Sequence, residues 1–135
     1  EITIADIYAM DPFGNELIAM ELSYAEMQQL IGNSLRRDRS PELHISGGSI
    51  EVYVDASNRL QKVKIYDEQG IELVDSKKYK VGMGSYIASS FKFNREDPGF
   101  SLGITTAQAI IDYIENNELK NYRDCDRREV IRETL

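Results

Sequence analysis

Residues 79–100 read Y-K-V-G-M-G-S-Y-I-A-S-S-F-K-F-N-R-E-D-P-G-F, and the rest of the chain is organised around this stretch. Its opening predicts a strand, because Tyr79, Val81 and Met83 alternate with less apolar residues. A loop with small residues follows, and it carries three of the four phenylalanines, Phe91, Phe93 and Phe100. Such rings are costly to leave in water. We therefore expect either that the loop folds back and buries them, the commoner outcome, or that they line a site for a flat ligand.

Length and composition bound the kind of protein. The chain has 135 residues, 41% of them hydrophobic and 29% charged, which is typical of one globular domain with a single core. Its net charge of −7 argues against non-specific binding to nucleic acid or to an anionic membrane. No apolar run approaches the roughly 20 residues of a membrane span. Cys125 is the single cysteine, so no intrachain disulfide is possible.

The first 15 residues predict a short helix and a turn. A hydroxyl at Thr3 stands three residues ahead of the carboxylate of Asp6, the pattern of a capped helix start, with an inner face formed by Ile4, Ile7 and Tyr8. Pro12 ends this helix. Residues 11–15 then form a turn with Phe13 at its tip, where a ring is more often tucked beneath the turn than displayed.

The middle of the chain predicts strands around one helix. Residues 16–22 form a strand, and a capping box at Ser23 and Glu26 starts a helix that buries Met27, Leu30, Ile31 and Leu35. Strands follow at residues 43–55, 60–66 and 71–74, the first of them interrupted by Gly47 and Gly48. Connections this short favour an antiparallel meander.

The last third predicts one more helix. Thr105 and Thr106 cap it, and its inner face is formed by Ile110, Ile111 and Ile114. Residues 122–135 are charged, and either a terminal strand or a frayed helix is compatible with them. The fold class we expect is α+β, mainly an antiparallel sheet packed by helices, with the helix after Ser23 and the helix at Thr106 both buried against that sheet.

The sequence offers little for catalysis. His44 is the single histidine, whereas zinc and dinuclear hydrolytic sites draw on several histidines, and a Ser-His-Asp triad would depend on His44 alone. Gly82 and Gly84 lack the third glycine and the lysine of a phosphate-binding loop. We predict no catalytic residue and no metal ligand, and we do not expect the chain to be catalytic alone.

Three groups of residues, taken in order, resemble one family. The opening E-I-T-I-A-D-I-Y-A-M-D-P-F-G-N-E-L is similar to a G-x-I-T-x-x-D-(x)n-P-F-x-N-x-L signature. Residues 45–48 with 52–55 are similar to an S-G then Y-D strand, and residues 75–85 to a D-x-x-K-x-Y-x-V strand. These are the motifs of the C-terminal domain of the 5′-nucleotidase family, and the resemblance covers nearly the whole chain.

The resemblance implies a hydrolase of two domains. Residues 1–135 are expected to form a single domain of this kind, truncated at its N-terminal edge and free of cofactors. A metallophosphatase domain or subunit, fused or separate, would be its partner and would hold the divalent metal ions and the chemistry. The resemblance also implies export, to the periplasm or the cell surface.

The resemblance further implies a nucleotide or nucleoside ligand clamped between two aromatic rings. Stacking of this kind is worth about 1–3 kcal/mol per base. Phe13 matches the family's first stacking ring. The second lies in a G-G-D-G-F/Y motif that this chain lacks, so Phe93 is the candidate and Phe91 its competitor, with Asn15 and Asp97 as weaker polar contacts.

Three functions remain open at the level of sequence. The first is the substrate-specificity domain of a 5′-nucleotidase-type phosphohydrolase. The second is a non-catalytic relative with a degraded pocket, serving as an interaction or structural module. The third is a pocket adapted to another flat or sugar-phosphate ligand.

Overall fold

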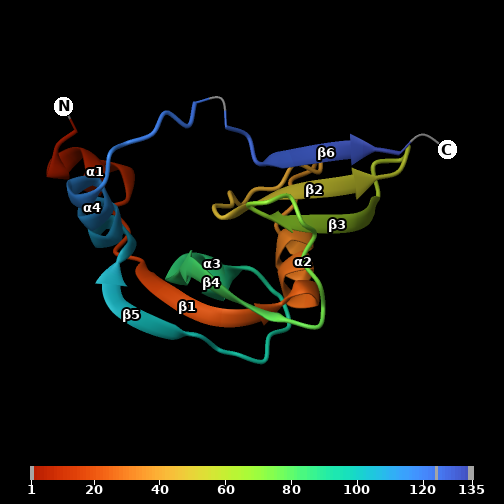
Figure 1. The fold of residues 1–135 in the computed structure, drawn as a ribbon, viewed down its shortest axis with the longest axis horizontal. Helices are drawn as coiled ribbons and strands as arrows, with labels where there is room; N and C mark the ends of the chain where they lie inside the picture. Colours follow the sequence, from red (N-terminus) through yellow and green to blue (C-terminus); the bar gives the residue numbers. More distant parts are fainter. Residues whose placement is uncertain (1, 124, 134–135) are drawn as a thin grey trace. The chain divides into compact units, whose positions relative to one another are not determined.

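The computed structural model describes residues 2–123 and 125–133 (Figure 1). Within these residues the helices are α1 (Ile4–Met10), α2 (Tyr24–Asn33), α3 (Ser85–Ser90) and α4 (Thr106–Asn116). The strands are β1 (Glu16–Ser23), β2 (Gly48–Val54), β3 (Leu60–Asp67), β4 (Lys78–Gly84), β5 (Phe100–Thr105) and β6 (Arg128–Arg132). The α+β class predicted from the sequence is confirmed.

The strands form two sheets of three strands each, with the orders β4-β1-β5 and β3-β2-β6. The expectation of one antiparallel sheet was therefore wrong in this detail. The meander stops after β3, because residues 71–74 contribute an isolated bridge between Tyr66 and Glu72 in place of a strand. The terminal segment, left open by the sequence, forms strand β6, which pairs with β2 in parallel.

The chain divides into two compact units, and the division falls within β1 and β4. Unit 1 comprises Glu1–Glu21, Lys80–Ser90 and Asp97–Arg123. Unit 2 comprises Leu22–Tyr79, Phe91–Glu96 and Asp124–Leu135. Each unit has an apolar cluster of its own.

The core of unit 2 follows from the alternation of β2. Ile50, Val52 and Val54 are at most 1% exposed, as their spacing predicts. Val63 and Ile65 of β3 pair directly with Val52 and Ile50. On the same side lies α2, which contributes Tyr24 and Ile31 to this cluster (Figure 1). Burying each such side chain stabilises the fold by about 1.5–3 kcal/mol.

A glycine is required where β2 begins. Gly48 pairs with Asp67 at the end of β3, and a Cβ built on Gly48 would lie 2.1 Å from the backbone oxygen of Tyr66. Gly47 before it has a φ of 79°. The two glycines that the sequence suggested as a bend thus mark the entry of the strand.

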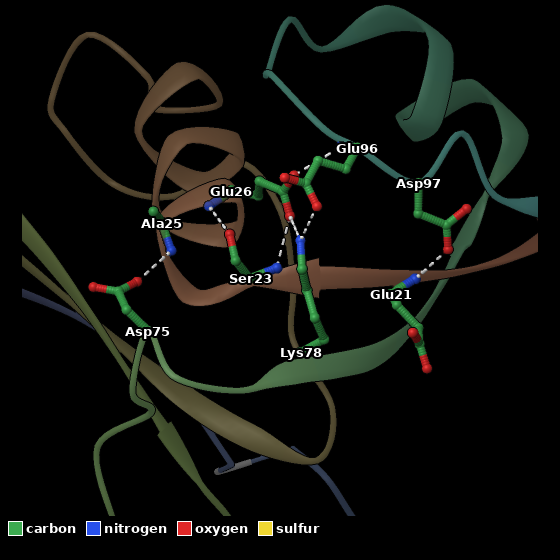
Figure 2. A network of polar contacts seen from close by, with 8 residues as sticks. All are labelled: Glu21, Ser23, Ala25, Glu26, Asp75, Lys78, Glu96 and Asp97. Carbon is green, nitrogen blue, oxygen red and sulfur yellow. Dashed lines mark hydrogen bonds and ion pairs between the residues drawn. The ribbon is translucent and has the colours of Figure 1, made fainter.

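The Glu26 carboxylate organises the start of α2 (Figure 2). Its Oε2 accepts the backbone N–H of Ser23 at 2.7 Å, while the Ser23 hydroxyl accepts the Glu26 N–H, completing the predicted capping box. Its Oε1 accepts the N–H of Glu96 at 2.8 Å, and Lys78 lies 3.4 Å from Oε2. The Ser23 N–H contributes most to lowering the pKa of Glu26, and partial burial acts in the opposite direction.

Unit 1 is built around the contact of α1 with α4. Ile7 packs with Ala107 and Ile111 of α4, as Figure 1 shows for the two helices. Ile4 and Tyr8, which the spacing placed on the inner face, are 58% and 48% exposed. Ile7 is the one buried residue of α1, so the inner face predicted for this helix was wrong for Ile4 and Tyr8.

Residues 85–90 form the short helix α3, where the sequence suggested a loop. The Ser89 hydroxyl donates to the backbone oxygen of Ser85, a contact that holds this turn. Further on, Gly99 has a φ of 78° and lies against β1, since its Cβ would stand 2.8 Å from Ile18. Only a glycine can lie this close to β1, and β5, which starts at the next residue, pairs antiparallel with β1.

We predict that Gly48→Ala destabilises the protein by about 2 kcal/mol, because the new methyl group overlaps the β3 backbone. The matched control is Gly82→Ala in β4, where a Cβ meets no atom within 4 Å. The control should stay within about 1 kcal/mol of wild type. Urea unfolding measures both, and equal effects of the two substitutions would contradict the steric argument.

We predict that Glu26→Gln destabilises the protein by about 1–2 kcal/mol at pH 7, because a carboxylate accepting several N–H groups is replaced by a neutral amide. A lowered folded-state pKa means that this stabilisation is present above the unfolded value, near pH 4.5, and is lost as the pH falls through the folded value. The difference between wild type and variant should therefore shrink in acid.

Urea titrations at pH 7 and between pH 4.5 and pH 3 measure this difference directly. Glu21→Gln is the control, because Glu21 is an exposed glutamate in the preceding strand whose side chain takes no part in the capping box. A pH-independent gap between wild type and Glu26→Gln would show that the carboxylate charge is not what stabilises α2.

Candidate functional site

The described residues contain no cluster of side chains that could bind a metal ion, so the candidate site consists of partly or fully exposed aromatic and polar side chains. In residues 2–123 and 125–133, no group of three or more His, Cys, Asp or Glu side chains is placed to hold a metal ion. Within the same ranges no helix has the length and apolar character needed to cross a bilayer.

Phe13 is the most prominent of these side chains. It sits at the tip of the turn between α1 and β1, beside Gly14, whose φ is 62°. Its exposed fraction is 79%, higher than that of any other large apolar side chain in the described part of the chain. The ring is displayed, and the commoner outcome of a ring tucked under the turn does not occur. The Phe13 side chain is therefore accessible to a ligand or to a partner chain.

Polar contacts from distant elements hold the Phe13 turn in place. The backbone N–H of Thr106 donates to the oxygen of Asn15 at 2.7 Å, and its hydroxyl donates to the carboxylate of Asp11. Ser85 accepts the N–H of Glu16 at 3.1 Å and donates to the Asn15 side-chain oxygen at 3.4 Å. Both ends of the turn are thus bound to the first residues of α4 and α3.

Asn15 has a structural part in this arrangement. Its backbone oxygen accepts the N–H of Thr106, and its side-chain oxygen accepts the hydroxyl of Ser85. The side chain therefore lies close to the base of the Phe13 turn, as a polar contact to a ligand on that ring would require. Contact between Asn15 and a ligand stays a prediction.

Phe91 and Phe93 lie in unit 2, on the segment between α3 and β5, and both are half-buried. The guanidinium carbon of Arg95 lies 5.1 Å from the centre of the Phe93 ring, the geometry of a cation–π contact. A base stacked on Phe93 would therefore take the opposite face of the ring. The sequence left two outcomes open for these rings: burial in the core, or exposure at a site for a flat ligand. Phe91 and Phe93 are half-buried, which lies between the two.

Asp97 acts on the backbone of unit 1. One carboxylate oxygen accepts the N–H of Glu21 at 2.7 Å, as Figure 2 shows, and the other accepts the N–H of Gly99 at 2.8 Å. These bonds fix the turn that leads into β5. A ligand contact by Asp97 stays a prediction.

The predicted site residues thus divide between the two units. Unit 1 contains Phe13, Asn15 and Asp97, and unit 2 contains Phe91 and Phe93. Sequence reasoning missed the anchors of the Phe13 turn, above all Thr106, which it treated as part of a helix cap. The signal was present in the second hydroxyl of the Thr105-Thr106 pair, since one threonine suffices as N-cap.

Comparison with known proteins agrees with the fold. A family model described as "5'-nucleotidase, C-terminal domain" matches residues 1–93. No curated protein matches the sequence. A 5'-nucleotidase precursor from Thermus thermophilus superimposes with a TM-score of 0.70 at 24% identity, covering 98% of this chain and 28% of that one.

The NAD nucleotidase of Haemophilus influenzae gives a TM-score of 0.71 at 18% identity, covering 98% of this chain and 27% of that one. At these identities the two structures establish the fold. The chain spans under a third of the length of either, so it corresponds to one part of a multidomain protein in both. With residues 1–93 matched by the family model, the chain belongs to the family of 5′-nucleotidase C-terminal domains.

Proposed function

We propose that this chain is the substrate-binding part of a 5′-nucleotidase-type phosphohydrolase, and that it recognises a nucleotide or nucleoside through its base. The observation that carries the proposal is the Phe13 ring, 79% exposed on a turn bound at both ends. Because the turn that carries the ring is already held by hydrogen bonds, ordering its backbone adds little to the cost of stacking a base on Phe13.

Phe93 is the second ring of the proposed clamp, with Phe91 as its competitor. The Phe93 ring is partly accessible and carries the Arg95 guanidinium on one face. A guanidinium beside the ring favours an anionic, electron-rich ligand such as a nucleoside phosphate. Asn15 and Asp97 complete the proposed contacts as polar groups.

Hydrolysis itself is assigned to a partner. We propose a metallophosphatase domain or subunit that holds the divalent metal ions, because the described residues of this chain provide no cluster of metal ligands. An exported location, periplasmic or on the cell surface, belongs to the same proposal, and fractionation of the native cells tests it.

We predict that Phe13→Ala weakens binding of AMP and adenosine by about tenfold, the loss of one stacked ring. The matched control is Phe100→Ala in β5, which removes another exposed ring, 63% exposed, on the residue that pairs with Ala19 of β1. Calorimetric titration of the full-length protein with each ligand provides the measurement, and the control should bind as wild type does.

Two results would redirect the proposal. Absence of heat with millimolar AMP and adenosine would reject the nucleotide clamp and favour the alternative of an interaction module with a degraded pocket. Measurable binding that Phe13→Ala leaves unchanged would assign the ligand to another surface of the protein.

A further inference from the structure

One face of α2 carries three polar side chains that all bind the same segment of chain. Glu26, Gln29 and Asn33 are spaced three and four residues apart, which places them in a row along the helix. Their partners lie in residues 92–96, which have no regular secondary structure. All of these residues belong to unit 2.

The partners are backbone groups of alternate residues. Glu26 accepts the N–H of Glu96 at 2.8 Å (Figure 2), and the side-chain oxygen of Gln29 accepts the N–H of Asn94. The amide nitrogen of Asn33 donates to the backbone oxygen of Lys92.

The chemistry of each of these contacts is unambiguous. A backbone N–H can only donate and a backbone oxygen can only accept, so the orientations of the Gln29 and Asn33 amides are fixed by their partners. Gln29 therefore acts as an acceptor and Asn33 as a donor.

The three side chains of α2 hold the backbone on either side of Phe93. Lys92 and Asn94, the residues on either side of Phe93, are each bound to α2 through their backbones. An irregular segment has no helix or sheet ladder to fix its backbone dihedrals. Contacts from a neighbouring helix are therefore the means of holding a ring on such a segment in one orientation.

We propose that Gln29 and Asn33, together with Glu26, are positioning residues that hold the Phe93 ring for ligand binding. The identity of the ligand rests on the function proposed above, whereas the fixing of the segment does not. Glu26 also caps α2, so its substitution changes the helix itself. Gln29 and Asn33 are therefore the residues on which the test depends.

The test compares Gln29→Ala and Asn33→Ala with a control from the same helix. Gln28 donates through its amide nitrogen to the oxygen of Val63 in β3, at 2.6 Å. Gln28→Ala removes a contact of the same type, from amide side chain to backbone, without touching residues 92–96. A general loss of stability would affect all three variants alike.

Two isosteric substitutions separate polarity from packing. Gln29→Glu keeps an acceptor for the Asn94 N–H and should retain wild-type behaviour. Asn33→Asp removes the donor to Lys92 and places a negative charge beside its oxygen, so it should behave as Asn33→Ala does. A role in packing alone predicts that both isosteres are tolerated.

The first readout needs no ligand. In the full-length protein, Gln29→Ala should speed exchange of the Asn94 amide by about fivefold, the equivalent of one net hydrogen bond, and ¹⁵N relaxation should show greater motion of residues 92–94 in the Asn33 variants. Gln28→Ala should leave both unchanged. Exchange and relaxation that stay at wild-type values in the Gln29 and Asn33 variants would overturn the proposal.

The second readout is the affinity for AMP as the probe. Gln29→Ala and Asn33→Ala should weaken binding by about three- to tenfold, and the loss should disappear when combined with Phe93→Ala, because their effect passes through that ring. Additive losses would overturn the positioning role. If wild-type protein binds no AMP, the proposed function fails, and the exchange and relaxation data still decide whether α2 fixes the segment.

Discussion

The Glu26 carboxylate joins the start of α2, residue Glu96 and the start of β4 in unit 2. One oxygen closes the capping box of α2, and the other binds the backbone of Glu96, while Lys78 at the start of β4 lies beside the carboxylates of Glu26 and Glu96. A single charged acceptor thus joins a helix start, an irregular segment and a strand. The Glu26 carboxylate is 12% exposed, so its bonds to backbone N–H groups are charge-assisted and weakly screened by water. Glu96 is 84% exposed, so its ion pair with Lys78 contributes little.

What the sequence could predict was local. The starts of α1, α2 and α4 were recognisable because a capping side chain and its backbone partner lie three residues apart. The buried face of β2 was also recognisable, because alternation of apolar residues is a pattern of near neighbours in the chain. The partition into two sheets and the parallel pairing of β6 with β2 were not predictable, since both depend on residues far apart in the chain.

In the candidate site, too, local features could be predicted from the sequence and contacts between distant residues could not. Phe13 was identifiable from its motif, but its display depends on contacts from Thr106 and Ser85, which no local pattern reveals. Gln29 and Asn33 carried no prediction from the sequence, because they stand at polar positions between the residues expected to be buried. Only the fold shows that they bind a second segment, because the partners lie some sixty residues later in the chain.

Both aromatic elements are held by polar contacts, and there is a physical reason for this. A ring that packs into a core is oriented by its neighbours, but a ring that must offer a face to a ligand cannot be enclosed in this way. What can be fixed is the backbone on which the ring stands. Thr106 and Ser85 do this for Phe13, and Gln29 and Asn33 for the segment of Phe93. Each such bond contributes only about 1 kcal/mol, and together they limit the backbone freedom of the two segments that carry the rings.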